Sequence, residues 1–141
     1  MRVCGVELKG NEAIICLMSL SDGLIDLPDC RVRRLTLIDV YNREQLAEFQ
    51  FAFGKLMEDY KVDKAVIRER ATKGKFSGSA NGFKMEAAIQ LIDTLDVETL
   101  SATEIKESLS HNPLPIPFAH TGLKGFQEGA FTTAFAAISR K

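Results

Sequence analysis

The sequence predicts an α/β fold in which a five-stranded mixed sheet is flanked by helices. Three observations lead to this fold class. The first forty residues are short apolar runs separated by glycine-containing turns, as in an antiparallel meander. From residue 42 onward, apolar residues recur at helical spacing, and these segments alternate with short strand-like runs. Three antiparallel strands followed by alternating helices and strands are typical of one mixed sheet covered by helices.

Length and composition predict one globular domain spanning residues 1–141. The chain is 45% apolar and 26% charged, which is ordinary globular usage. No window approaches the roughly 18 continuous apolar residues of a membrane span, and the N-terminus lacks the features of a signal peptide. Cys4, Cys16 and Cys30 form no C-x-x-C pair, so we expect reduced thiols and no zinc site. We therefore expect a cytoplasmic protein with no membrane partner.

The antiparallel part of the sheet is predicted from three runs. Residues 3–8 and 13–20 are β-type runs joined across Gly10-Asn11, and glycine accepts the positive φ that a hairpin turn needs. A second turn follows at residues 21–23. A weaker third strand is expected over residues 31–38, where apolar side chains interleave with arginines.

The alternating part begins with an amphipathic helix, for which Asn42 and Gln45 form a capping pair. Its apolar stripe consists of Leu46, Phe49, Phe53, Leu56 and Tyr60. A strand is expected over residues 64–69, then a loop over 72–82 and a helix over 83–95.

A fifth strand is predicted at residues 97–100, and a capping box of Ser101 and Glu104 then opens a short helix that ends at residue 109. Residues 111–121 contain three of the four prolines and predict an irregular loop. The last helix is expected over residues 123–139, with an apolar face made of Phe126, Ala130, Phe131, Ala134, Phe135 and Ile138.

Charge limits the functions that the chain can have. Eighteen basic and nineteen acidic residues give a net charge of −1, so any nucleic-acid site must be a local basic patch rather than a global field. The loop at residues 73–78 lacks the spacing of a phosphate-binding P-loop. No G-x-S-x-G or Cys/His arrangement suggests acyl chemistry.

Three glutamates are candidates for chemistry. Glu7 shares a pleat face of the first strand with Val3 and Gly5, where a carboxylate is costly unless it is paired or metal-bound. Glu69 ends the fourth strand, where ligands of α/β sheets gather. Glu128 lies at the rim of the apolar face of the last helix. Each also has a plainer interpretation, as a solvated strand end or as a first-turn glutamate favoured by the helix dipole.

Taken together, the element order and these acids resemble the ribonuclease H-like superfamily, and its Holliday-junction resolvase branch most closely. The opening strand of that branch carries an acid in a G-[IV]-D-x-G context, and this chain reads Gly5-Val6-Glu7-Leu8-Lys9-Gly10. Its second acid precedes a loop and a helix rich in small residues, as Glu69 precedes residues 77–88 here. A short helix, a proline loop and a lysine before the last helix correspond to residues 101–109, the proline loop and Lys124.

The resemblance implies a metal-dependent nuclease or phosphodiesterase of the ribonuclease H-like type. Glu7, Glu69 and Glu128 would be the catalytic ligands of Mg²⁺ or Mn²⁺, because carboxylates are the hard oxygen ligands that these ions prefer. Lys73, Lys75 and Lys124 would contact phosphate. The partner would be structured DNA or RNA, and a homodimer fits the likeness.

Two departures keep an alternative open. The first acid of the branch is normally aspartate, and here it is Glu7. The last helix of resolvases tends to carry two aspartates one turn apart, and here it offers Glu128 alone. The alternative is a non-catalytic scaffold that kept the fold and binds nucleic acid or protein.

Overall fold

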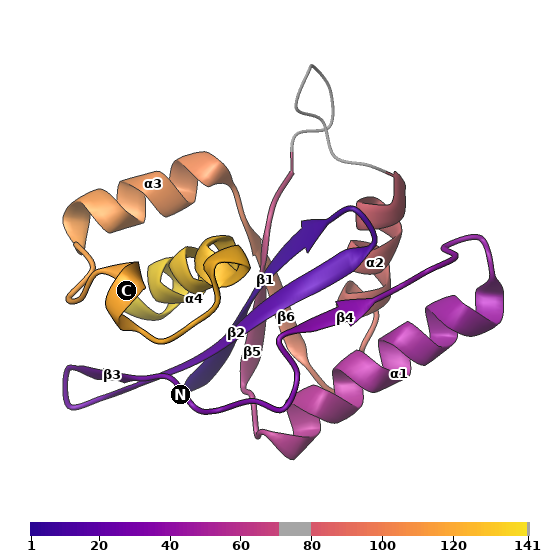
Figure 1. The fold of residues 1–141 in the computed structure, drawn as a ribbon, viewed down its shortest axis with the longest axis horizontal. Helices are drawn as coiled ribbons and strands as arrows, with labels where there is room; N and C mark the ends of the chain where they lie inside the picture. Colours follow the sequence, from indigo (N-terminus) through magenta and orange to yellow (C-terminus); the bar gives the residue numbers. More distant parts are fainter. Residues whose placement is uncertain (71–79, 141) are drawn as a thin grey trace.

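In the computed structural model, which describes residues 1–70 and 80–140, one mixed sheet carries helices on both faces (Figure 1). The strands are β1 (Arg2–Lys9), β2 (Glu12–Ser21), β3 (Leu24–Asp26), β4 (Arg34–Thr36), β5 (Lys64–Arg68) and β6 (Asp96–Leu100). The helices are α1 (Arg43–Asp59), α2 (Ala80–Gln90), α3 (Ala102–His111) and α4 (Glu128–Ser139), with 3₁₀ turns at Phe118–His120 and Gly125–Gln127.

The sheet has the order β3-β2-β1-β5-β6, and β4 pairs with the other end of β2. β1 and β2 are antiparallel and are joined by a turn in which Gly10 has a φ of 57°. β5 lies parallel to β1, and β6 lies parallel to β5. The carboxyl ends of β1, β5 and β6 therefore lie at the same edge of the sheet, which we call the carboxyl edge.

The strands alternate between two faces of the sheet. On one face, Cys4, Val6 and Leu8 of β1 pack in the cluster that includes the buried phenylalanines of α1 and the buried residues of α2. On the other, Val3 of β1 packs with Phe131 and other buried residues of α4. The sheet is thus the middle layer of three, with α1 and α2 on one side and α3 and α4 on the other (Figure 1).

The predicted α/β fold class is confirmed, and so are two predicted helix starts. The side chain of Asn42 accepts a hydrogen bond from the backbone N–H of Gln45 and caps α1. Both bonds of the capping box between Ser101 and Glu104 are present at the start of α3.

The expected reduced thiols agree with the structure. All three thiols are free, and Cys4 and Cys16 are buried. Burial raises the pKa of the Cys16 thiol to about 12, which keeps it protonated and unreactive.

Several predicted boundaries were wrong. The sheet has six strands rather than five, because a strand of three residues, β3, follows the turn in which Asp22 and Gly23 have positive φ. The strand expected over 31–38 shortens to β4. The helix expected over 83–95 begins at Ala80 and ends at Gln90, and Ile92 and Leu95 beyond it still pack on the core. None of the helices in residues 1–70 and 80–140 is long and apolar enough to cross a membrane.

The last α-helix begins at Glu128 instead of residue 123, because a side-chain bridge holds the preceding turn. The amide of Gln127 donates to the carbonyl of Ile15 in β2 and accepts from the backbone N–H of Lys124. These two bonds fix residues 125–127 as a 3₁₀ turn. Phe126 therefore leaves the apolar face predicted for it and packs against the guanidinium of Arg34.

Candidate functional site

The carboxyl edge gathers the beginnings of three helices. α3 starts directly after β6, and Arg70, two residues past β5, contacts Gly82 and Phe83 in the first turn of α2. The first turn of α4 lies against Glu7 of β1. Helix N-termini carry partial positive charge and unpaired N–H groups, so this edge favours anions.

Glu7 is half-buried and points at the first turn of α4. A Cβ placed on Gly129 would come within 2.5 Å of the carboxylate of Glu7, so only a glycine leaves room for it there. The face of β1 predicted for Glu7, shared with Val3 and Gly5, is therefore the face that it occupies. Glu128, the residue before Gly129, is exposed at the first position of α4. Glu7 thus lies against the helix turn to which Glu128 belongs.

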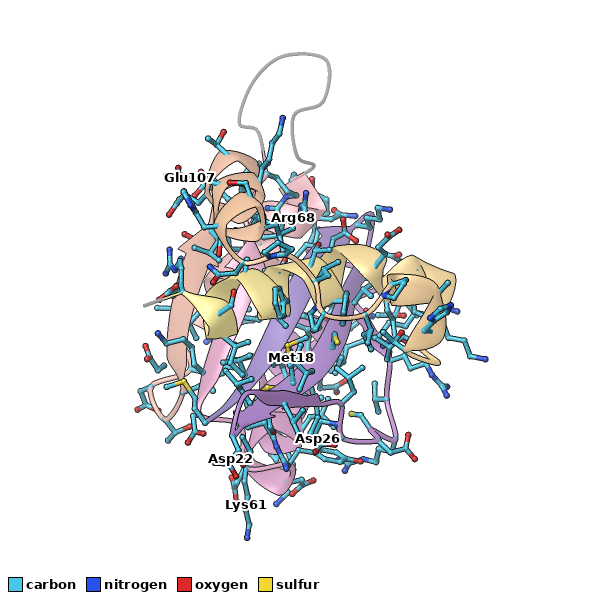
Figure 2. The ribbon with its side chains drawn as sticks, turned by 90° about the vertical axis from the view of Figure 1, so that its left-hand side faces the viewer. Met18, Asp22, Asp26, Lys61, Arg68 and Glu107 are labelled. Carbon is cyan, nitrogen blue, oxygen red and sulfur yellow. The ribbon has the colours of Figure 1, made fainter. Side chains whose placement is uncertain are left out.

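The neighbour of Glu7 on the adjacent strand is a cation. Gly5 pairs with Val66 and Val6 with Ile67 in the parallel ladder, so the next position along places Arg68 beside Glu7. The guanidinium of Arg68 donates from Nη1 to Oγ1 of Thr132 in α4, over 3.3 Å. Arg68 therefore faces α4, as Glu7 does (Figure 2 labels Arg68 on this side of the molecule).

Glu69 lies on the opposite pleat face. Its backbone N–H donates to the carbonyl of Leu100 and extends the pairing of β5 with β6 by one residue. Alternation puts its side chain on the side of Ala65 and Ile67, which face α1 and α2, and the side chain is exposed. On that side it interacts with Glu86 of α2, a like charge, and raises the pKa of that carboxyl group.

Behind Glu69, Arg70 and Glu86 form an enclosed pair. Nη1 of Arg70 lies 3.9 Å from Oε1 of Glu86, and the two side chains are 13% and 17% exposed. The pKa of Glu86 is raised, mainly by burial. The positive charge of Arg70 lowers it in part, and the negative charge of Glu69 raises it. Burial also lowers the pKa of Arg70, whose guanidinium lies 4.4 Å from the Phe83 ring.

The lysines predicted to contact phosphate have different outcomes. Lys124 is exposed and precedes α4 at the carboxyl edge. Lys73 and Lys75 lie outside the described residues. Lys84 of α2 is engaged elsewhere, since it donates to the carbonyl of Val40 and lies 4.3 Å from the Tyr41 ring.

The structure does not bring the three predicted metal ligands together in one site. Across residues 1–70 and 80–140, no three His, Cys, Asp or Glu side chains lie close enough together to hold a metal ion. The side chain of Glu69 faces away from Glu7, and Arg68 occupies the position beside Glu7 on the neighbouring strand. The described residues therefore do not fit a shared site for two metal ions, which needs several carboxylates around each ion.

Sequence reasoning missed the roles of Arg68, Arg70 and Glu86. No motif in the sequence singles out these three residues. The role of Arg68 follows from the parallel register of β1 and β5, which cannot be derived from a single sequence. The spacing of Gly82 and Phe83 from Glu86 is the only local sign of the enclosed pair.

Comparisons with known proteins agree with the fold. Residues 1–137 match the family described as "Protein of unknown function (DUF3010)". A search of curated proteins finds no match. Thermus thermophilus RuvC is similar in structure, with a TM-score of 0.69 and 8% identity over 99% of this chain and 94% of that one.

Two further solved structures have the same fold. T. thermophilus RuvC in complex with a Holliday junction substrate has a TM-score of 0.66 at 9% identity, over 99% of this chain and 93% of that one. The yeast mitochondrial Holliday junction resolvase Ydc2 has a TM-score of 0.61 at 8% identity, over 97% and 75%. The structural neighbours are thus RuvC-type resolvases, and the predicted ribonuclease H-like fold is confirmed.

Proposed function

We propose that this chain, which belongs to the DUF3010 family, binds structured DNA or RNA at the carboxyl edge of its sheet and holds the phosphate backbone there without cleaving it. The observation that carries the proposal is Arg68. It places a permanent positive charge beside Glu7, where a shared metal site would need a second carboxylate.

The charge around the edge supports this function. Arg68 ends β5 at the carboxyl edge, and the exposed Lys124 lies four residues before α4, whose first turn lies against Glu7. Lys73 and Lys75, which the sequence predicts to contact phosphate, lie outside the described residues. The net charge of −1 means that binding depends on such a patch rather than on the whole surface.

A second candidate function is metal-dependent phosphodiester hydrolysis. One observation favours it, namely that Glu7 and Glu128 approach the same first turn of α4. Mg²⁺ or Mn²⁺ would supply Lewis acidity and activate water for attack on phosphorus. In this reading Glu7 and Glu128 would hold the ion together with oxygens of the substrate, and Glu69, on the opposite pleat face, would take no part.

One experiment separates the two functions. Binding of a labelled four-way junction and of the matching duplex is measured against salt, in EDTA and then with Mn²⁺. We expect binding of the junction in EDTA and no cleavage product in Mn²⁺. The Lys124→Gln variant should weaken binding and lower the slope of log affinity against log salt by about one unit, because one phosphate contact is lost.

The matched control is Lys61→Gln, since Lys61 is exposed just before the amino end of β5, at the opposite edge. It should bind like the wild type. Cleavage that requires Mn²⁺ and disappears in Glu7→Gln would establish the second candidate instead. Absence of binding to junction and duplex alike would reject both functions.

A further inference from the structure

Arg68 and Glu7 are cross-strand neighbours on one face of the sheet. Gly5 and Val66, two residues earlier on each strand, both face α3 and α4: a Cβ on Gly5 would meet Ala130, and Val66 packs with Ala136. Side chains two residues apart on a strand point to the same side. Glu7 and Arg68 therefore project side by side toward the first turns of α4.

The guanidinium of Arg68 is tethered at one corner only. Nη1 donates to Oγ1 of Thr132, and the same hydroxyl donates to the carbonyl of Gly129 over 3.1 Å. Gly129 is also the residue that lies against the carboxylate of Glu7. Within the described part of the chain, Thr132 is the sole hydrogen-bond partner of this guanidinium, which has five N–H donors.

A permanent cation at this place has two consequences. It repels a divalent cation bound at the carboxylate of Glu7, because neighbouring strands are only about 5 Å apart and the ion would lie close to the guanidinium. It also offers a planar fork of donors that matches two oxygens of a phosphate group. The same side chain thus disfavours one ligand class and favours another.

We infer that Arg68 is the phosphate-contacting residue of the carboxyl edge and takes the position that a metal ligand would need beside Glu7. The ligand it binds is a phosphodiester group of the nucleic-acid backbone, so this inference rests on the proposed function. Thr132 is a positioning residue, because it holds the guanidinium against α4 while the remaining donors point to the ligand.

The charge reversal Arg68→Glu gives the sharpest test. It places two carboxylates on adjacent parallel strands about 5 Å apart, close enough to share one ion beside Glu128. Calorimetry with Mn²⁺ needs no nucleic acid. We expect no detectable binding by the wild type at millimolar Mn²⁺, and binding by Arg68→Glu with a dissociation constant at least about tenfold below that limit.

Arg68→Gln is the second variant, in case the charge reversal prevents folding, which circular dichroism will report. It removes the charge while keeping a polar side chain, so junction binding in EDTA should weaken by about tenfold or more, and the salt slope should fall by about one unit. Arg68→Lys keeps the charge without the fork and should recover part of the affinity. Lys61→Glu makes a matched charge reversal at the opposite edge and should leave Mn²⁺ binding and junction binding unchanged.

Two results would overturn the inference while leaving nucleic-acid binding intact. One is a wild-type junction affinity retained in Arg68→Gln. The other is tight Mn²⁺ binding by the wild type that Arg68→Glu does not improve. Failure of the wild type to bind any nucleic acid would instead reject the proposed function, and the Mn²⁺ arm would still decide whether Arg68 excludes the metal.

Discussion

Arg70 and Glu86 are the most enclosed charged pair at the carboxyl edge. A Cβ on Gly82 would come within 2.9 Å of Arg70 Cζ, so the guanidinium occupies the space that a glycine leaves open. All three guanidinium nitrogens and Oε1 of Glu86 are buried and lack a hydrogen-bond partner in the described part of the chain. Groups in this condition reduce stability, because their lost hydration is not replaced.

The pH dependence of unfolding should report this cost. Burial raises the pKa of Glu86 in the folded protein above its usual value of 4.5, so the folded state binds the proton more tightly than the unfolded state does. The stabilising contribution of the protonated group is complete below that usual value and is lost as pH rises through the folded pKa. In Glu86→Gln we expect a smaller loss of stability across this window, measured by urea unfolding at a series of pH values.

The control for this prediction is Glu107→Gln, a substitution at an exposed glutamate of α3. It should follow the wild-type dependence on pH. A wild-type dependence retained in Glu86→Gln would mean that another group causes it.

At the residue scale, the sequence predicted positions better than partners. The pleat face of Glu7 follows from alternation along its own strand, which is a local property, and it agrees with the structure. That Glu69 lies on the opposite face of the sheet depends on how β1 and β5 pair. Arg68 became a neighbour of Glu7 only through the pairing of residues about sixty positions apart, which local patterns do not encode.

At the scale of elements, β1 and α4 touch backbone to backbone. A Cβ on Gly5 would lie 2.1 Å from the carbonyl oxygen of Ala130 and 2.7 Å from the backbone nitrogen of Ala134. These are atoms of the main chain of α4, which cannot move without displacing the helix. A Cβ on Gly129 would instead meet the end of the Glu7 side chain, which can rotate away.

Two alanine substitutions should therefore behave differently. Gly5→Ala should lower the free energy of unfolding by about 2 kcal/mol or more, because it overpacks a rigid contact. Gly129→Ala should be close to neutral, since alanine favours the helix by up to about 1 kcal/mol and Glu7 gives way. Chemical denaturation of both variants checks the contrast, and an equal loss in Gly129→Ala would mean that Glu7 is fixed by its surroundings.

Element boundaries that depend on residues close together in the sequence were predicted, and those that depend on distant residues were not. The start of α3 is encoded within four residues, by Ser101 and Glu104. β3 has only three residues and forms because β2 is already present to pair with it. The start of α4 depends on Gln127 reaching Ile15, more than a hundred residues away, so apolar spacing alone placed it too early.

At the scale of the whole molecule, the fold is shared with proteins whose sequences have very little in common with this one. The chain superposes on RuvC over almost its full length at 8% identity, so the arrangement of layers does not depend on particular side chains. What determines activity is the small set at the carboxyl edge. There this chain has Arg68 beside Glu7, and that combination favours binding of phosphate over capture of a metal ion.

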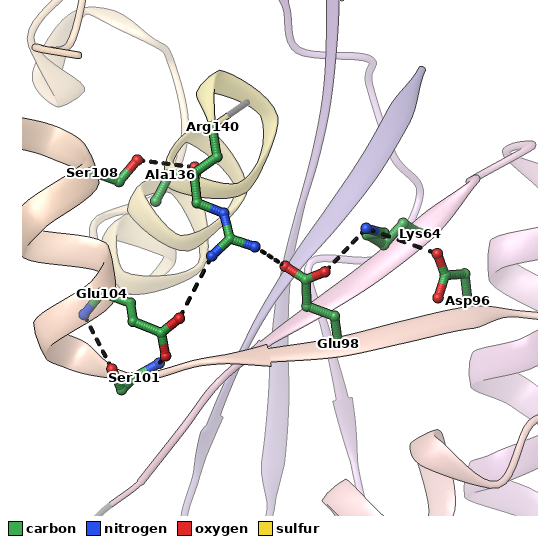
Figure 3. A network of polar contacts seen from close by, with 8 residues as sticks. All are labelled: Lys64, Asp96, Glu98, Ser101, Glu104, Ser108, Ala136 and Arg140. Carbon is green, nitrogen blue, oxygen red and sulfur yellow. Dashed lines mark hydrogen bonds and ion pairs between the residues drawn. The ribbon is translucent and has the colours of Figure 1, made fainter. Parts of the chain in front are cut away.

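The end of the chain is joined to the sheet by a charged network, which Figure 3 shows. Arg140, the residue after α4, contacts Glu98 of β6 and Glu104 of α3. Glu98 also contacts Lys64 at the start of β5, over 3.0 Å. The network therefore connects both helices of one face to two parallel strands.

We expect Arg140→Gln to lower the free energy of unfolding by about 0.5–1 kcal/mol at low salt, as partly exposed ion pairs do. The side chains of Arg140 and Glu98 are 40% and 28% exposed, so high salt should screen the interaction and reduce the loss. A double-mutant cycle with Glu98→Gln isolates the coupling. Arg31→Gln, which removes the exposed ion pair with Asp59 at the end of α1, is the matched control. Coupling that persists unchanged in high salt would show that packing of the arginine stem, rather than its charge, holds the chain end in place.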